Sequence, residues 1–117
     1  MKFIKILLLK IFGEKNYLSF TASTFQQLYK TGKVGILYQD VYFLKNIIKE
    51  GDYTADIGAH LGYYTFELSR LTGEKGKVIA IEPVNKFHSV IQKLIKRYRT
   101  PLWTISRRSY KRCRKRI

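Results

Sequence analysis

Two short apolar runs flank a helical repeat of apolar residues in the middle of the chain. The runs cover residues 53–57 and 78–81, and glycines and charged residues bound them, as is typical of short buried strands. Between the runs, apolar residues recur along a helix that begins near Tyr63 and ends at Gly73, a residue type common at helix C-termini. The pattern therefore predicts a strand, a helix and a second strand, which together make a parallel βαβ unit.

Helices are predicted before and after this unit in the sequence, so the expected fold class is α/β. The most regular of them begins at Asn85, where apolar residues at spacings of three and four give one apolar face. Asp40 can cap another helix, and two glycines make residues 31–35 a loop before it. The predicted flanking helices cover residues 1–12, 19–30, 40–48 and 85–98.

A glycine-rich turn separates the first strand from the helix that follows it. The turn is Asp-Ile-Gly-Ala-His-Leu-Gly, residues 56–62. Gly58 lets the chain leave the strand in a conformation that a side chain would obstruct, and it lets the backbone approach a ligand. Gly62 clears the entry to the helix, where free backbone N–H groups attract a carboxylate. Glu82 ends the second strand and is placed to bind both hydroxyls of a ribose, so the unit is predicted to bind a nucleotide.

The glycine spacing favours one class of nucleotide. A dinucleotide fingerprint, G-x-G-x-x-G, closes the backbone on a pyrophosphate. In this chain Gly58 and Gly62 lie four residues apart, and the turn has no third glycine. Such a turn suits a nucleoside with an amino-acid tail better than it suits a diphosphate. We therefore predict S-adenosylmethionine as the cofactor.

The same stretch resembles the first motifs of class I S-adenosylmethionine-dependent methyltransferases, and among them the FkbM-type family. Members of that family carry a D-x-G-A-[N/H]-x-G-Y-Y-T core followed by an E-P step. This chain has both, and its step is Glu82-Pro83. The resemblance covers about residues 40–95. It implies an incomplete Rossmann-like methyltransferase fold, with strand, helix, strand and helix over residues 40–98 and a helical extension over residues 1–39.

The resemblance also implies roles for individual residues. Glu82 would hold the ribose of the cofactor, and Pro83 would turn the chain past the adenosine. Tyr63 would lie near the cofactor. The residues that would line the methionine end of the cofactor are Asp56, Gly58, Ala59 and Gly62.

His60 stands where the family more often has Asn. We predict that it is a turn residue beside the cofactor. The alternative is a catalytic base, since an unperturbed imidazole titrates near pH ~6.5. The implied reaction is methyl transfer to an oxygen of an unknown acceptor. In the family the acceptor and base residues lie mostly beyond the fourth strand, and nothing in this chain corresponds to them, so no catalytic residue is assigned.

The net charge of +15 comes mostly from the end of the chain. Residues 93–117 hold 11 Lys and Arg and no acidic residue, and the family pattern stops after Arg99. We expect residues 99–117 to be a disordered basic tail that arises from a frameshifted or prematurely ended reading frame. The alternatives are a genuine basic arm and a short third strand at residues 102–105 before a disordered end. A tail of this charge is expected to bind polyanions without sequence preference.

The expected activity follows from the small number of strands that the sequence predicts. A sheet of two confident strands would be marginally stable and would hold the cofactor loosely. We therefore expect a weakly active or inactive methyltransferase. The alternatives are a non-enzymatic remnant of the fold and a small basic nucleic-acid-binding protein.

Residues 1–12 are apolar, with lysines at positions 2, 5 and 10. Their longest uncharged run is four residues, whereas a spanning helix needs about 20 and a signal peptide needs an apolar core of at least ~7. We predict a helix packed on the body of the protein. The alternative is an amphipathic helix in peripheral contact with a membrane, its lysines near the lipid headgroups. The lone cysteine, Cys113, fits a reducing compartment and a cytoplasmic location, and no spacing of His and Cys indicates a metal site.

Overall fold

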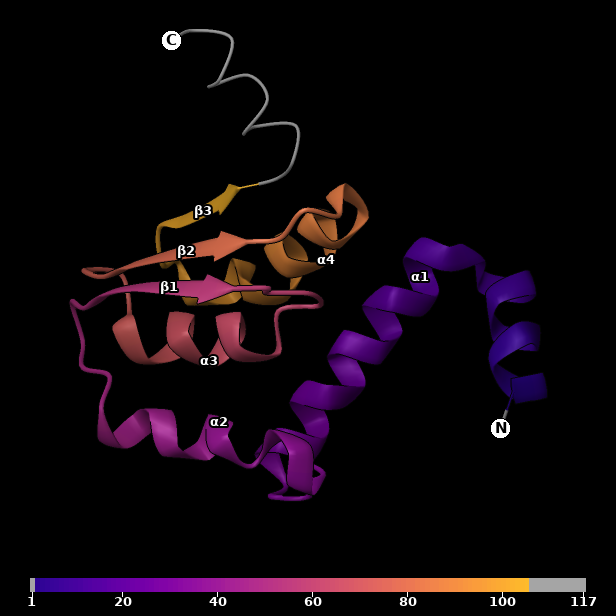
Figure 1. Ribbon diagram of the computed structural model, residues 1–117, viewed down its shortest axis with the longest axis horizontal. Coiled ribbons are helices and arrows are strands. Elements are labelled where there is room, and N and C mark those ends of the chain that lie inside the picture. The colour runs from indigo at the N-terminus through magenta and orange to yellow at the C-terminus, as the bar shows by residue number, and fades with distance from the viewer. Residues whose placement is uncertain (1, 106–117) are drawn as a thin grey trace, which may run out of the picture.

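Three parallel strands form the centre of the fold. The computed structural model describes residues 2–105, apart from the side chain of Arg97. The strands are arranged in the order β1-β2-β3 (Figure 1). Their bounds are Tyr53–Ile57 for β1, Lys77–Ile81 for β2 and Leu102–Ile105 for β3. The helices are α1 (Lys2–Lys30), α2 (Asp40–Phe43), α3 (Tyr63–Thr72) and α4 (Asn85–Ile95). The predicted α/β class is confirmed.

The βαβ unit forms where the sequence predicts it. β1 pairs with β2 in parallel over the full length of both strands. α3 connects them and ends directly before Gly73, whose backbone has a φ of 63°. The N–H of Gly73 donates to the carbonyl of Ser69 at 3.2 Å, which closes the last turn of the helix. Glycine is favoured here because a side chain would strain a backbone of this hand.

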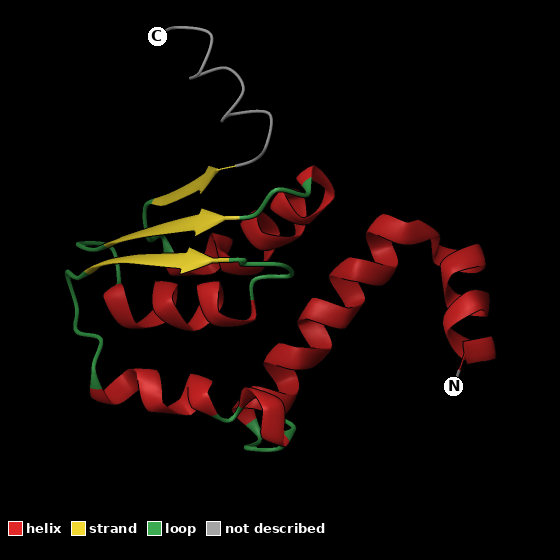
Figure 2. Cartoon of the chain, viewed as in Figure 1, coloured by secondary structure: helices red, strands yellow, loops and turns green. Residues whose placement is uncertain are grey.

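The helices cover one face of the sheet and leave the other open. Side chains alternate between the two faces along a strand. On the covered face, Ala80 of β2 is fully buried and packs against Ile91 of α4. On the opposite face, Tyr53, Ile57 and Trp103 are 76%, 80% and 59% exposed. Figure 2 shows the helices gathered to one side of the three strands. The described part of the sheet thus has an uncovered apolar face.

The core lies between α1, α3 and α4. Phe25 of α1 stacks on the ring of Tyr63, with the centroids 4.1 Å apart, and meets Phe66 edge to face at 6.0 Å. The predicted helix at 85–98 is α4 followed by a 3₁₀ turn at Lys96–Tyr98. The buried residues of the main core cluster are Ala22, Phe25, Val34, Val41, Leu61, Phe66, Val90, Leu94 and Ile95. The apolar face predicted for the 85–98 helix therefore faces this core.

β3 corrects the prediction that residues 99–117 are a disordered tail. Residues 102–105 pair in parallel with β2, with Trp103 opposite Ile79. The segment before the strand is fixed because the buried hydroxyl of Thr100 donates to the carbonyl of Ser69 at 2.6 Å. The short third strand, which the sequence left as an alternative, is confirmed. The rest of the predicted tail, residues 106–117, lies outside the described residues.

α1 joins two helices that the sequence predicts as separate. The expected segments at 1–12 and 19–30 belong to one element that leaves helical geometry at Gly13, where φ is 73° and ψ is 159°. The chain bends at this residue, so the N-terminal end of α1 turns away from the rest of the helix (Figure 1). A glycine tolerates this backbone, which explains the position of the bend.

The segment before the bend does not pack on the body of the protein. Phe3 is 89% exposed and Ile11 is 63% exposed. The predicted packing of residues 1–12 is therefore wrong. Among the described residues, every helix is too short or too polar to cross a membrane.

The α2 region is also shorter than expected. The predicted helix at 40–48 is α2 followed by a 3₁₀ turn at Leu44–Asn46. Val41 is fully buried in the core, whereas Ile47 is 56% exposed. The apolar spacing therefore places the first turn of this helix correctly and overestimates its length.

A buried carboxylate links α1 to α3. Glu67 is fully buried and accepts a hydrogen bond from the hydroxyl of Tyr29 at 2.5 Å. Arg70 donates to both oxygens of Glu67, from Nε at 2.8 Å and from Nη2 at 2.6 Å. Burial, and then the hydrogen bond to Glu67, raise the pKa of Tyr29 to about 12. The hydrogen bonds to Glu67 also raise the pKa of Arg70. The protonated hydroxyl of Tyr29 therefore helps to hold the two helices together.

We expect Tyr29→Phe to lower the free energy of unfolding by about 1–2 kcal/mol near neutral pH, because Glu67 loses a buried donor. The unfolded chain ionises Tyr29 near pH ~10, and the folded chain does so only near 12. The difference in stability between the wild type and Tyr29→Phe should therefore be constant below pH ~10 and disappear as the pH rises through 12. Denaturant unfolding of both proteins across this range measures it. Tyr53→Phe, at an exposed residue, is the control, and an unchanged difference at high pH would contradict the account.

Candidate functional site

The turn after β1 has left-handed backbone at three positions. Gly58, His60 and Gly62 have φ of 79°, 48° and 82°. Glycine reaches this region without a steric penalty, and among other residues Asn and His are enriched there. Position 60 therefore needs a residue that tolerates positive φ, which gives a conformational reason for the Asn or His of the resembling motif.

Backbone hydrogen bonds fix the turn to the end of β2. The N–H groups of Gly58 and Ala59 both donate to the carbonyl of Ile81, at 2.8 Å and 3.2 Å. The N–H of Gly62 then donates to the carbonyl of Ala59 at 2.7 Å, which closes the turn before α3 begins. The position of the turn is therefore set by the neighbouring strand as well as by its own glycines.

The two glycines of the turn meet different surroundings. A β-carbon at Gly62 would lie 3.1 Å from Cγ1 of Ile91 in α4, so this glycine allows close packing of the helix. A β-carbon at Gly58 would have no atom within 4 Å. Gly58 is needed for its backbone conformation alone, and the space beside it is free for a ligand.

Glu82 joins the turn to the segment after β2. It is 5% exposed, and its Oε2 accepts a hydrogen bond from the backbone N–H of His60 at 2.9 Å. Its Oε1 accepts one from the backbone N–H of Val84 at 2.8 Å. The ring of His88 donates through Nε2 to the carbonyl of Glu82 at 2.7 Å. The carboxylate of Glu82, which is predicted to bind ribose, thus already accepts two hydrogen bonds from backbone N–H groups. Each of its oxygens retains one lone pair.

Asp56 is held by the first turn of α3. Its Oδ2 accepts a hydrogen bond from the hydroxyl of Thr65 at 2.5 Å. Burial raises the pKa of Asp56, the hydrogen bonds from Thr65 oppose that rise, and the charge of Glu82 adds to it. The two carboxylates are therefore close enough to affect each other electrostatically across the turn.

The rings of His60 and Tyr63 turn toward the helices. The His60 ring lies 4.5 Å from that of Phe87 and 6.2 Å from that of Tyr63. Tyr63 stacks on Phe25, and burial raises its pKa. The Tyr63 ring therefore belongs mainly to the core, and its edge meets the ring of His60 in the turn. Pro83, directly after Glu82, is exposed.

The structure brings the predicted site residues together at one end of the sheet. They lie at the carboxyl ends of β1 and β2 or at the start of α3 (Figure 1). The set is Asp56, Gly58, Ala59, His60, Gly62, Tyr63, Glu82 and Pro83. Ligands of open parallel sheets bind at this end, beyond the carboxyl ends of the strands.

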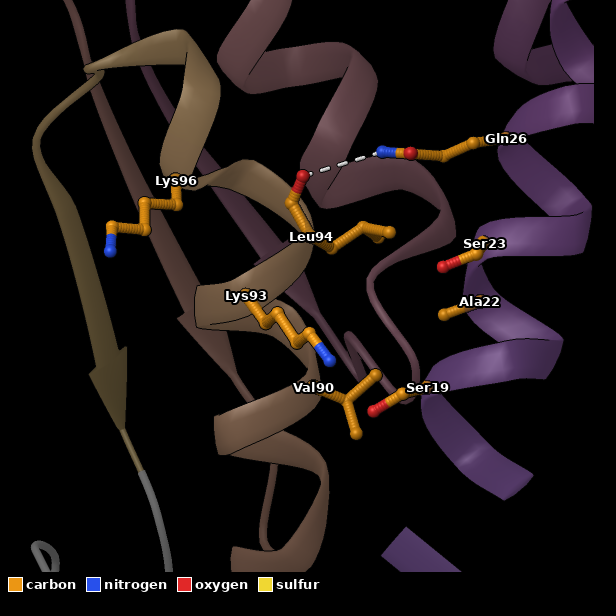
Figure 3. Close-up of a pocket in the computed structure, with 8 residues that line it drawn as sticks. All are labelled: Ser19, Ala22, Ser23, Gln26, Val90, Lys93, Leu94 and Lys96. Atoms are coloured by element: carbon orange, nitrogen blue, oxygen red, sulfur yellow. Dashed lines mark hydrogen bonds between the residues drawn. The ribbon is translucent and has the colours of Figure 1, made fainter. Parts of the chain in front are cut away.

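A separate cavity of about 450 Å³ lies between α1 and α4 (Figure 3). Lys93 extends into it toward Val90, whereas Lys96 points away from it. The amide of Gln26 donates to the carbonyl of Leu94 at 3.4 Å across it. The predicted site residues do not line this cavity, so its position gives no support to the cofactor site.

Neither metal ligands nor known relatives identify the site. Among residues 2–105, no group of three or more His, Cys, Asp or Glu side chains is placed to hold a metal ion. The chain matches no model of a known protein family, and a search of curated proteins finds no match. The methyltransferase resemblance therefore rests on the residues of this chain alone.

Three further residues contribute to the site without having been assigned from the sequence. Thr65 binds the carboxylate of Asp56, Val84 donates its N–H to Glu82, and Phe87 packs on the turn. Thr65 had a signal, because it ends the Y-Y-T motif and lies in the first turn of the helix. A backbone donor such as that of Val84 leaves no side-chain signal, because any residue except proline supplies it.

The two glycines of the turn give a matched pair of variants. We expect Gly58→Ala to lower the free energy of unfolding by about 1–2 kcal/mol, the usual cost of left-handed backbone with a side chain. Gly62→Ala should cost at least about 1 kcal/mol more, because its methyl group also overpacks against Ile91. Denaturant unfolding measures both. Gly35→Ala, at a φ of −59° with open space around it, is the control and should not lower stability. Equal losses at positions 58 and 62 would contradict the packing role of Gly62.

Proposed function

We propose that the described residues form the cofactor site of an S-adenosylmethionine-dependent methyltransferase of the FkbM type, and that the reaction is methyl transfer to an oxygen. The observation that carries the proposal is the bond between Glu82 and the turn at His60, at the carboxyl ends of two adjacent parallel strands. The parallel order of the strands and the helices on one face are compatible with the first half of a Rossmann-like fold.

The turn fits the amino-acid end of the cofactor. Gly58 is exposed, and its surroundings leave room for a ligand against the backbone. The first N–H groups of α3 lack carbonyl partners within the helix, as at any helix start, and favour a carboxylate. The tail of S-adenosylmethionine carries such a carboxylate. The carboxylates of Asp56 and Glu82 provide negative charge for the positively charged part of the ligand.

The ribose would bind at Glu82. Both oxygens of this carboxylate accept a backbone N–H, so the ribose hydroxyls would use the lone pairs that remain. The two backbone bonds would then orient the carboxylate for the sugar. Val84, whose N–H binds this carboxylate, is 39% exposed and would offer apolar surface to the adenine.

The chain's part in the reaction would be to bind and align. Bound S-adenosylmethionine supplies an electrophilic methyl carbon, because its sulfur is positively charged. The turn and Glu82 would fix the position of that carbon, and alignment is the main requirement for such a displacement. We assign no base and no acceptor-binding residue among residues 2–105.

We propose further that the chain transfers methyl groups weakly or not at all. Gly58 is exposed, and Ile57 beside it points to the uncovered face of the sheet. A ligand at the turn would therefore be enclosed mainly from the helix side, and an alignment error of about 1 Å can cost roughly a hundredfold in rate. The same observation favours cofactor binding without catalysis as the second candidate function.

Titration with S-adenosylhomocysteine tests the site. We expect Glu82→Ala to weaken binding at least about tenfold, because unmet ribose hydroxyls cost about 1–3 kcal/mol each. Calorimetry of the wild type and the variant measures the change. Glu50→Gln, at an exposed carboxylate away from the turn, is the matched control and should bind as the wild type does.

A second ligand separates ribose binding from simple loosening of the turn. The wild type should bind S-adenosylhomocysteine about tenfold more tightly than its 2′-deoxy analogue, and Glu82→Ala should lose this preference. Equal affinities of the wild type and Glu82→Ala for S-adenosylhomocysteine would exclude the assignment. Tighter binding of NAD would overturn the class of cofactor.

A further inference from the structure

The N-terminal end of α1 exposes an unusual amount of apolar surface. Residues 2–12, here called the arm, precede the bend at Gly13. Six large apolar side chains of the arm are more than half exposed: Phe3, Ile4, Ile6, Leu7, Ile11 and Phe12. Contiguous exposed apolar surface of this kind marks an interaction site more often than a free surface.

The arm has two chemically different sides. At about 100° per residue, its lysines at positions 2, 5 and 10 all fall on one half of the helix, which they share with Ile6 and Leu9. The other half is apolar throughout and consists of Phe3, Ile4, Leu7, Leu8, Ile11 and Phe12. A half-circle of apolar residues is wider than the two-position seam with which paired helices contact one another. The arm therefore fits a broad apolar surface better than a narrow protein groove.

The apolar surface continues across the bend. A groove of about 240 Å³ at the bend is lined by Leu8, Phe12, Asn16, Tyr17 and Phe20. Phe20, beyond the bend, is 64% exposed. Glu14, next to the bend, forms an ion pair with Lys86 in the first turn of α4. This pair links the base of the arm to the body of the protein.

We infer that the arm binds the surface of an anionic lipid bilayer. The apolar half would face the acyl chains, and the three lysines would lie at the level of the headgroups, where their long side chains reach the phosphates. The arm carries no acidic residue, and the whole chain has a net charge of +15. That charge attracts an anionic surface and makes two copies of the chain repel each other, so a bilayer is a better occupant than a second copy.

Vesicle flotation of the full chain tests the inference. The probes are vesicles of phosphatidylcholine alone and of phosphatidylcholine mixed with phosphatidylglycerol, each at low salt and at about 0.5 M NaCl. High salt reduces the Debye length to below about 8 Å, so attraction by the basic end of the chain is largely screened while apolar contact remains. We expect binding to the mixed vesicles at both salt concentrations. A triple variant, Phe3→Ser, Leu7→Ser and Ile11→Ser, should bind at least about tenfold less at high salt.

A matched control removes apolar side chains elsewhere. Ile36 and Leu37 are 82% and 83% exposed outside the arm, and Ile36→Ser with Leu37→Ser should bind as the wild type does. Because the three arm positions are exposed, the triple variant should keep the thermal melt of the wild type. Binding that is lost completely at high salt in the wild type would mean attraction by charge alone and would overturn the inference. Equal binding by the wild type and the triple variant would also overturn the inference. So would a wild type that forms a dimer and does not bind vesicles, if the triple variant is a monomer.

Discussion

The arrangement of the candidate site depends on the buried carboxylate of Glu82. A buried carboxylate is costly unless donors surround it, and here each oxygen accepts a backbone N–H, one from the turn and one from the segment after β2. One side chain therefore joins two irregular segments, the turn that follows β1 and the segment that follows β2. The left-handed backbone at His60 is stabilised by this bond, because its N–H is directed at the carboxylate. If the carboxylate were removed, the turn would keep its glycines but lose its attachment at His60.

The rest of the described structure supports this attachment from one side. α3 begins directly after the turn and binds Asp56 through Thr65, and α4 packs so closely on Gly62 that a methyl group there would be crowded. α1 then packs on α3 through Phe25 and the Tyr29 hydrogen bond to Glu67, and it reaches α4 through the hydrogen bond from Gln26 to the carbonyl of Leu94. The opposite face of the sheet remains apolar and exposed in the described residues. This one-sided support is the physical reason that we propose binding of a cofactor together with weak catalysis.

The sequence predicts the parts of the fold that depend on local patterns. β1, α3 and β2 follow from two apolar runs and the glycines at 58, 62 and 73, because each feature acts within a few residues. β3 was missed as a firm element because its pairing depends on β2 and on the bond from Thr100 to Ser69, which are distant in the sequence. The sequence predicted two separate helices at 1–12 and 19–30, and the single bend at Gly13 was not anticipated. The exposure of the arm could not be deduced from its composition, because packing on the body and contact with lipid require the same apolar residues.

The sequence predicted that the candidate residues lie together, and it did not predict the hydrogen bonds between them. The spacing of the turn and Glu82 placed the residues at one end of the sheet, and the structure brings them together there. That Glu82 binds the backbone of His60 and Val84 could not be inferred, because backbone donors are present at nearly every position and only the folded geometry selects two of them. The inward direction of the Tyr63 ring depends on its stacking with Phe25, a contact between distant segments.

The central claim is that the turn and Glu82 together bind the adenosyl cofactor, and amide chemical shifts in the full chain test it most directly. On addition of S-adenosylhomocysteine, the shifts should be concentrated at the backbone N–H groups of Gly58, His60, Gly62 and Glu82. The amide of Tyr53, at the opposite end of β1, should change little. Shifts that avoid the turn, or equal shifts at these four positions with NAD, would contradict the claim.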